Sequence, residues 1–261
     1  MRLDGAMLGA LASEAGLAPA SIVVAPLDGR PQAVLDPERA LYPASMIKVP
    51  LAAATLAEVE AGRLRLRDRH PVTAANLTAN DLESPLVEGY EASLEALLHA
   101  AIARSDNVAT NLLFDIVGRE RATVLARERL GLPATRFARK LSGSDPLLPD
   151  PGWDGRSRNA HPASDAARLF AAIAAGEIPG AALLLGMLAA QAWNEKLSPG
   201  LAEGDRFAHK TGDTSEVTHD GGILETASGR RYAVVVYTGL PSTDANNARF
   251  APFMRKVRER L

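Results

Sequence analysis

Ser45 and Lys48 are the residues whose types and spacing could start a reaction, and both lie in the stretch LYPASMIKVPLAAATLAEVEAG. Residues three apart in an α-helix share a face, so the serine Oγ and the lysine Nζ can come within hydrogen-bond reach. Burial lowers the pKa of a lysine, and the neutral amine could take the serine proton and make the hydroxyl a nucleophile. The structural alternative is a serine that caps a core helix, followed by a lysine whose stem lies along the apolar surface.

Two further short motifs follow in the chain. The tripeptide Ser-Asp-Asn occupies 105–107 at a predicted helix junction, and Lys-Thr-Gly occupies 210–212 at the end of a predicted strand. Taken singly, the first is typical of a helix N-cap and the second of an ordinary strand end. Their joint occurrence, in this order behind Ser45, is much harder to attribute to chance.

Hydrophobic periodicity predicts the elements that must position these motifs. The alanine-rich stretch that begins near Ser45 is typical of a core helix, which Gly62 ends. The run 63–85 is expected to be a connection with one short helical turn, and the proline-rich stretch 133–162 a long loop. Other helices are expected at 4–15, 93–104, 108–117, 119–130, 162–175, 181–190 and 244–261, and strands at 21–27, 32–35, 207–210, 222–226 and 231–238.

The order of these elements predicts an α+β protein. One helix and two strands precede a long all-helical stretch, and three strands and a last helix follow it. We therefore expect a five-stranded antiparallel sheet assembled from both ends of the chain, flanked by N- and C-terminal helices, with an all-helical subdomain inserted. Residues 1–261 would form a single unit, with a sheet subdomain at about 1–42 and 200–261 and a helical subdomain at about 43–199.

The composition argues against several classes of function. A formal net charge of -2 and an aromatic content of 5% disfavour a nucleic-acid partner. The chain has no cysteine, and its five histidines are scattered without metal-ligand spacing, so we expect no metal and no cofactor. No apolar run is long enough to span a membrane, and residues 1–17 lack the basic segment and apolar run of a secretory leader.

The three motifs, in the contexts PASMIKVPLAAA, AAIARSDNVATNLL, AHPASDAARLF and FAHKTGDT, resemble those of the penicillin-recognising serine hydrolases, specifically the class A β-lactamases. The resemblance covers nearly the whole chain and implies the β-lactamase fold and a small-molecule substrate, either a β-lactam or an acyl-D-Ala-like compound. It implies that Ser45 attacks a lactam carbonyl to form an acyl-enzyme, while Lys48 assists removal of the proton. Ser105 and Lys210 would relay a proton to the leaving nitrogen.

The same resemblance implies how the reacting group would be held. Asn107 would orient Lys48 and the substrate's side-chain amide. The backbone N–H groups of Ser45 and Asp213 would form the oxyanion hole, which stabilises the negative charge that develops on the carbonyl oxygen.

The Lys-Thr-Gly strand, with Lys210, Thr211 and Gly212, would bind the other end of the substrate, its carboxylate held by the first two residues. Many relatives add an arginine on the next strand, but the stretch 219–222 contains none. Lys196 lies about where some relatives place a compensating arginine. The alternative for Lys196 is a solvated surface lysine.

The long loop departs from the family pattern. Class A enzymes carry a glutamate there that activates the deacylating water, and alignment by Thr135 and Arg139 places Leu141 at that position and Asp145 at the position of a following asparagine. No glutamate occurs from 129 to 176. A leucine cannot accept a proton, so another base must act or deacylation must be slow. Asp145 is the possible substitute base; the alternative for it, and more so for Asp150 and Asp154 further along, is a turn-forming aspartate.

Three functions stay open on these grounds. The first is a hydrolase that β-lactams acylate at Ser45 and that deacylates slowly or by another base. The second keeps the nucleophile but acts on a D-alanyl peptide, an ester or an acyl acceptor. The third is a penicillin-binding or sensor protein without turnover. Relatives usually work outside the cytoplasm, whereas this sequence begins without a leader, so the compartment stays open as well.

Overall fold

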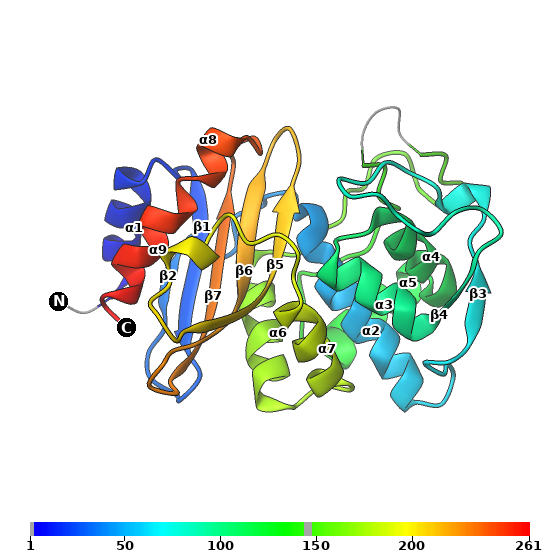
Figure 1. The fold of residues 1–261 in the computed structure, drawn as a ribbon, viewed down its shortest axis with the longest axis horizontal. Coiled ribbons are helices and arrows are strands. Elements are labelled where there is room, and N and C mark those ends of the chain that lie inside the picture. The colour runs from blue at the N-terminus through cyan, green and yellow to red at the C-terminus, as the bar shows by residue number, and fades with distance from the viewer. Residues whose placement is uncertain (1–2, 144–147) are drawn as a thin grey trace.

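Strands from both ends of the chain form one antiparallel sheet with the order β2-β1-β7-β6-β5, in a computed structural model that describes residues 3–143 and 148–261 (Figure 1). Ile22 of β1 lies opposite Val236 of β7, so the first and last strands of the chain are neighbours. The predicted α+β class and five-stranded sheet are confirmed. The strands are β1 Ala20–Pro26, β2 Ala33–Leu35, β5 Arg206–Asp213, β6 Thr218–Glu225 and β7 Arg231–Thr238.

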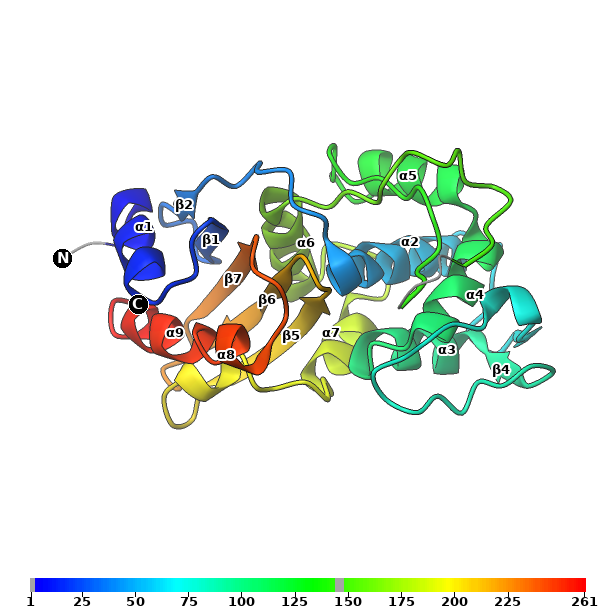
Figure 2. The same ribbon diagram turned by 90° about the horizontal axis from the view of Figure 1, so that it is seen from above.

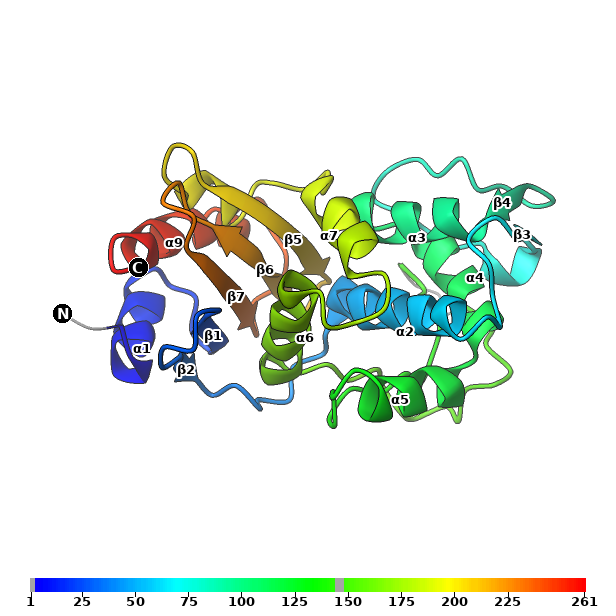
Figure 3. The same ribbon diagram turned by 90° about the horizontal axis from the view of Figure 1, so that it is seen from below.

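The two faces of the sheet carry separate apolar cores, because side chains alternate along a strand. On one face, Val236 packs in a core with α1 (Gly5–Glu14) and α9 (Phe250–Arg258), which lie side by side in Figure 2. On the other, Val235 faces the larger core, and α6 (Ala163–Ala175) covers the sheet there (Figure 3). The sheet is thus enclosed between helical layers.

The helical part is arranged around α2, which contacts each of its neighbouring helices and is buried along most of its length. Its alanines allow the surrounding helices to approach closely, and Figure 3 shows it passing between α7 and α5. Among the described residues, none of the helices combines the length and hydropathy needed to cross a bilayer. The helices of this part are α2 Lys48–Glu60, α3 Leu94–Ala103, α4 Asn107–Val117, α5 Arg119–Glu128 and α7 Ala181–Ala189.

The predicted helices and strands are present, with differences at some of their ends and in the connection 63–85. The helix expected from Ser45 begins with a 3-10 turn, η1 (Ala44–Ile47), before α2. The last helix is divided into α8 (Asp244–Asn247) and α9. The segment 63–85 and the residues just after it contain a small two-stranded sheet, β3 (Arg69–Pro71) with β4 (Glu91–Ser93), besides the expected turn of helix at 74–76.

Strands β5 and β6 are longer than the predicted 207–210 and 222–226, and their extra residues include four that are polar but buried, Thr211, Thr218, His219 and Asp220. His219 hydrogen-bonds through Nε2 to the Tyr42 carbonyl at 2.8 Å, and Asp220 contacts His209 Nδ1 at 2.7 Å. Partners on other segments of the chain satisfy these groups, which a local hydrophobic pattern does not reveal. The long stretch 133–162 has no helix or strand in its described residues apart from one bridge between Arg136 and Ala160.

Candidate active site

Ser45 lies in η1, where the helical part meets β5. The preceding residue, Ala44, has a φ of 47°, in the left-handed region where a side chain is strained. At Gly212 the strand approaches this turn so closely that an added Cβ would lie 3.0 Å from the Pro43 carbonyl oxygen and 3.1 Å from Met46 Cγ. The glycine of Lys-Thr-Gly therefore allows β5 to reach the Ser45 turn.

Lys48 is buried, and its Nζ donates to Asn107 Oδ1 at 2.7 Å, to Ser105 Oγ at 3.1 Å and to the Ser105 carbonyl oxygen. Burial, and secondarily the charge of Lys210, hold the pKa of Lys48 well below its usual value. Helical spacing predicted contact with Ser45 Oγ, but within the described chain Lys48 makes no such hydrogen bond. Its amine is held instead by the turn that leads into α4, where Ser105 and Asn107 supply three acceptors.

Ser105 connects the two lysines of the site. It lies between α3 and α4 with a φ of 58°, a second strained position. Its Oγ accepts from Lys48 Nζ at 3.1 Å and from Lys210 Nζ at 2.8 Å. A hydroxyl that lies between two amines can pass a proton from one to a third group in the cavity.

Lys210 is fully buried on β5, and its Nζ also donates to the Thr211 carbonyl oxygen at 2.9 Å. Burial lowers the pKa of Lys210 to about 7; Asp213 opposes this shift and Lys196 adds to it. The amine therefore changes charge near neutral pH. Such a group can serve either as a cation for an anionic substrate or as a proton carrier.

Asn107 begins α4 and is held from both sides. The Asp106 side chain caps the helix by accepting from the Ala109 N–H at 2.8 Å. Asn107 Nδ2 donates to the Ala79 carbonyl at 2.8 Å, which leaves Oδ1 facing Lys48. Helix capping thus fixes the amide that orients the lysine.

Lys196 is fully buried, so its interpretation as a solvated surface lysine is wrong. Its Nζ donates to Asp213 Oδ1 at 2.5 Å and to the His219 carbonyl at 3.0 Å. Asp213 also accepts from Ser242 Oγ at 2.6 Å and from Thr218 Oγ1 at 3.1 Å. Burial would raise the pKa of Asp213, but Lys196 and these donors hold it below its usual value.

Two cavities open beside Ser45. One of about 550 Å³ is also lined by Asn107, Leu141 and Asp213. A smaller one of about 210 Å³ is lined by Ser45, Ser105, Thr211 and Asp213. All three sequence motifs therefore contribute a residue to the space around the Ser45 hydroxyl.

Leu141 is buried, and Asn111 of α4 fixes its backbone. The Leu141 N–H donates to Asn111 Oδ1 at 2.8 Å, and Asn111 Nδ2 donates to the Leu141 carbonyl at 2.8 Å. Sequence reasoning missed Asn111, although a polar residue on the buried face of a predicted helix is a signal that could have been used. These two hydrogen bonds therefore hold the loop at the point where the Leu141 side chain lines the larger cavity.

The loop aspartates have structural partners where they are described. Asp150 pairs with Arg119 and accepts from the Lys140 N–H at 2.8 Å. Asp154 accepts from the Ser157 N–H at 2.7 Å and Oγ at 2.6 Å, and these bonds and others of the same turn lower the pKa of Asp154 to about 2. Both behave as loop- and turn-forming residues. Asp145 lies outside the described residues.

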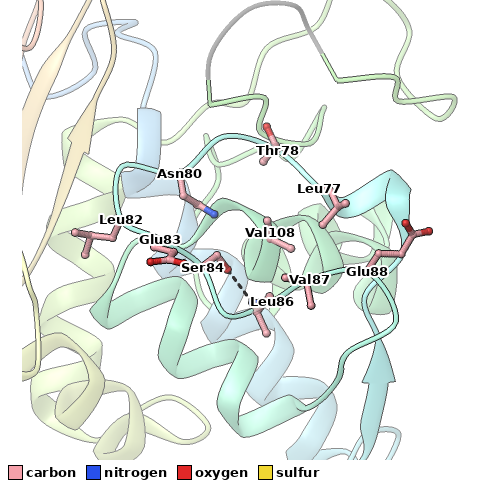
Figure 4. A pocket seen from close by; sticks show the side chains of 10 residues that line it. All are labelled: Leu77, Thr78, Asn80, Leu82, Glu83, Ser84, Leu86, Val87, Glu88 and Val108. Atoms are coloured by element: carbon pink, nitrogen blue, oxygen red, sulfur yellow. Dashed lines mark hydrogen bonds between the residues drawn. The ribbon is translucent and has the colours of Figure 1, made fainter.

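A further hollow of about 310 Å³ lies along 77–88, and Ser45 is not among the residues that line it. Leu77, Leu86 and Val87 contribute apolar side chains, together with Val108 of α4 (Figure 4).

The described residues contain no group of three or more His, Asp or Glu side chains that could hold a metal ion.

Comparisons with known proteins find relatives of this chain in sequence and in fold. The model of the beta-lactamase enzyme family matches residues 6–258. A curated beta-lactamase of Rhodobacter capsulatus is 37% identical over 86 residues, which make up 33% of this chain and only 29% of that protein.

Solved structures are similar over nearly the whole chain. The beta-lactamase of Sphaerobacter thermophilus has a TM-score of 0.83 at 25% identity, over 98% of this chain and 97% of that one. A variant of the class A beta-lactamase of the last common ancestor of Gram-negative bacteria has a TM-score of 0.83 at 27% identity, over 98% and 97%. An acyl-enzyme complex of a PBP-A variant with penicillin G shares the fold, with a TM-score of 0.82 at 23% identity over 97% and 94%.

Proposed function

Because the chain belongs to the beta-lactamase enzyme family, we propose that Ser45 is the nucleophile of an active-site serine hydrolase that β-lactams acylate. Its Oγ attacks the lactam carbonyl carbon, a C–O bond forms and the ring C–N bond breaks. Lys48, whose pKa is lowered by burial, takes the Ser45 proton. A proton then reaches the ring nitrogen through Ser105 Oγ, so the proton lost by the serine ends on the leaving group.

The observation that carries this proposal is the position of Ser105 Oγ, 3.1 Å from Lys48 Nζ and 2.8 Å from Lys210 Nζ. Two buried lysines that share one hydroxyl are costly for stability, because each would be better solvated at the surface. An arrangement of this cost beside a half-buried serine is typical of a catalytic site.

We further propose that the acyl-enzyme is long-lived. Leu141 lines the larger cavity with Ser45 but cannot accept a proton from water. A positioned general base is worth about 10²–10⁴-fold in rate, so its absence should slow deacylation by a similar factor. The PBP-A variant solved as an acyl-enzyme with penicillin G supports looking for such an adduct here.

A time course of intact protein mass after mixing with excess benzylpenicillin, with lactam consumption followed in parallel, tests both statements. We expect a persistent adduct on the wild type and none on Ser45→Ala. Ser13→Ala, which removes an exposed serine on α1, is the matched control and should behave as wild type. An adduct that survives in Ser45→Ala would mean that the nucleophile is another residue, and rapid turnover would mean that a substitute base exists.

Leu141 also favours a second function on the same nucleophile, which is the hydrolysis of D-alanyl peptides or esters, or acyl transfer to an amine. An acceptor that carries its own nucleophile depends less on a water-activating carboxylate. Turnover of an ester or of an acyl acceptor, without lactam consumption, would select this function. A stable adduct with every acyl donor would instead select a penicillin-binding or sensor role.

A further inference from the structure

Asp213 places a carboxylate where the Lys-Thr-Gly strand would hold a substrate's own carboxylate. It follows Gly212 at the end of β5, and it lines both cavities that open at Ser45. Its side chain is 31% exposed, so part of the carboxylate faces the space a substrate would occupy. Two carboxylates in one partly desolvated site repel each other.

Lys196 offsets this repulsion only in part, because its side chain is buried and, unlike Asp213, lines neither cavity. Its side chain is 0% exposed and its Nζ donates to Asp213 Oδ1 and to the His219 carbonyl. Turning this ammonium toward a ligand would leave Asp213 unpaired, and breaking one side of a buried ion pair is strongly unfavourable. The carboxylate is therefore the member of the pair that faces the cavities.

The remaining charges of the smaller cavity are mostly negative. Asp81 and Glu195 line it, and neither forms an ion pair within the described chain. Lys210 reaches this end of the site, but it donates to Ser105 and to the Thr211 carbonyl. An anionic group in this smaller cavity would thus meet three acids against the single amine of Lys210, whereas a neutral or cationic group would not meet this net repulsion.

We propose that the Asp213–Lys196 pair selects acyl donors that are neutral or positively charged at the position where penicillins carry a carboxylate. The proposal rests on Ser45 being the acylated nucleophile, as proposed above, and it names the substrate class of that site. Amides and esters without a carboxylate beside the reacting carbonyl, including those that bear an amine there, form this class. Asp213 is then a specificity-determining residue as well as a source of an oxyanion-hole N–H.

Benzylpenicillin and its methyl ester are a matched pair of probes, because they share the reactive ring and differ only in the charge of the carboxyl group. The measurement is the second-order rate constant for adduct formation on Ser45, by intact mass, with both probes. We expect the wild type to react at least tenfold faster with the ester, after correction for the difference between the probes in reaction with hydroxide. An equal or greater rate with the acid would overturn the proposal.

Asp213→Asn keeps the size of the side chain and removes its charge, which frees Lys196 for an anionic ligand. In this variant the ratio of the acid's rate constant to the ester's should rise at least tenfold over wild type. Asp81→Asn removes an exposed acid from the same cavities and is the control, with a smaller rise of about threefold at most. A ratio unchanged by Asp213→Asn contradicts the selection.

The wild-type comparison keeps the proposal open to refutation if Asp213→Asn does not fold. Failure of the selection and failure of the proposed nucleophile give different results. Adducts with both probes but no preference for the ester reject only the selection, whereas no adduct with either probe rejects the nucleophile and the selection that rests on it.

Discussion

At the scale of single residues, strained backbone and buried amines lie next to two hydroxyls, those of Ser45 and Ser105. Ala44 and Ser105 both have positive φ values, of 47° and 58°, and each adjoins or supplies a hydroxyl of the site. Lys48 and Lys210 are buried within hydrogen-bond distance of Ser105 Oγ. Each of these features lowers the stability of the fold. Their concentration around these hydroxyls indicates that the residues serve the geometry of the site rather than the stability of the protein.

Leu141→Glu should shorten the life of the acyl-enzyme. The new carboxylate would lie in the cavity that Ser45 lines and could activate water, so the deacylation rate constant should rise roughly 10²-fold or more, while the protein loses some stability from a buried acid. Decay of the penicillin adduct, followed by intact mass, measures it. Leu141→Gln is the control: glutamine is similar in size to glutamate but has no carboxylate, so its adduct should decay at the wild-type rate. Equal decay of the adducts of all three proteins would mean that another group activates the water.

Lys210→Met should stabilise the fold near neutral pH and abolish rapid acylation. The pKa of Lys210 is about 7 in the folded state, compared with about 10.5 in the unfolded chain. The buried lysine therefore lowers the free energy of unfolding progressively as pH falls from about 10.5 to about 7. Each unit of pKa corresponds to about 1.4 kcal/mol, so the effect should reach a few kcal/mol.

Urea unfolding of wild type and Lys210→Met at pH 6, 7.5 and 9 measures this effect. The variant should be the more stable protein at pH 6, and its advantage should shrink toward pH 9. A constant difference between the two proteins across this range would show that Lys210 titrates normally in the folded state.

At the scale of elements, the site is a meeting of η1, the start of α4 and the end of β5. The sequence was sufficient to predict these elements, because apolar periodicity and capping residues are local signals that tertiary packing reinforces here. It also predicted which polar residues converge, since three short motifs mark the three elements. The direct Ser45–Lys48 hydrogen bond was not obtained, because the first turn is a 3-10 turn and Lys48 has better acceptors in Ser105 and Asn107.

What the sequence did not reveal are pairings between distant residues. Lys196 can be buried because its ammonium donates to Asp213 Oδ1 and to the His219 carbonyl. Neither partner is apparent from the residues next to Lys196 in the sequence. Asn111 fixes Leu141 from another helix. Hydrogen bonds of this kind depend on the finished fold, whereas periodicity reports only the local chain.

Gly212→Ala should impair acylation without unfolding the protein. The added Cβ would lie 3.0 Å from the Pro43 carbonyl and 3.3 Å from Ala44 Cβ, so β5 must move away from η1. Shifts of this order cost roughly 10–100-fold in rate. Gly186→Ala on α7, where an added Cβ meets nothing within 4 Å, is the control and should keep the wild-type rate. The rate of adduct formation measures acylation, and circular dichroism shows whether the variant is folded. A wild-type rate of adduct formation in Gly212→Ala would contradict the close approach of β5 to η1.

At the scale of the whole molecule, the sheet separates the site from one of the two cores. The core shared by α1 and α9 lies on the face of the sheet opposite the larger core that contains α2. Residues of α9 can therefore set stability without touching the substrate. The limits of the two subdomains, at about 42 and 200, stay a prediction.

Phe253→Ala should lower the free energy of unfolding by roughly 3–5 kcal/mol, since the ring is fully buried against α1 and the sheet. The rate of Ser45 acylation in the cold, where the variant stays folded, should equal that of wild type. Arg255→Ala, at an exposed position of the same helix, should change stability little. Slow acylation of fully folded Phe253→Ala would mean that the two cores are coupled.

The pairing of β1 with β7 also bears on how the protein is made. Ile22 and its partner Val236 are roughly 200 residues apart, and a ribosome that adds about 5–20 residues per second needs roughly 10–40 s to supply the second strand. During that interval the nascent chain already contains Ser45, but the strand that carries Lys210 has not been docked beside it. Acylation of Ser45, as proposed above, should therefore be confined to finished molecules, and a chain stalled during translation should not react with a penicillin.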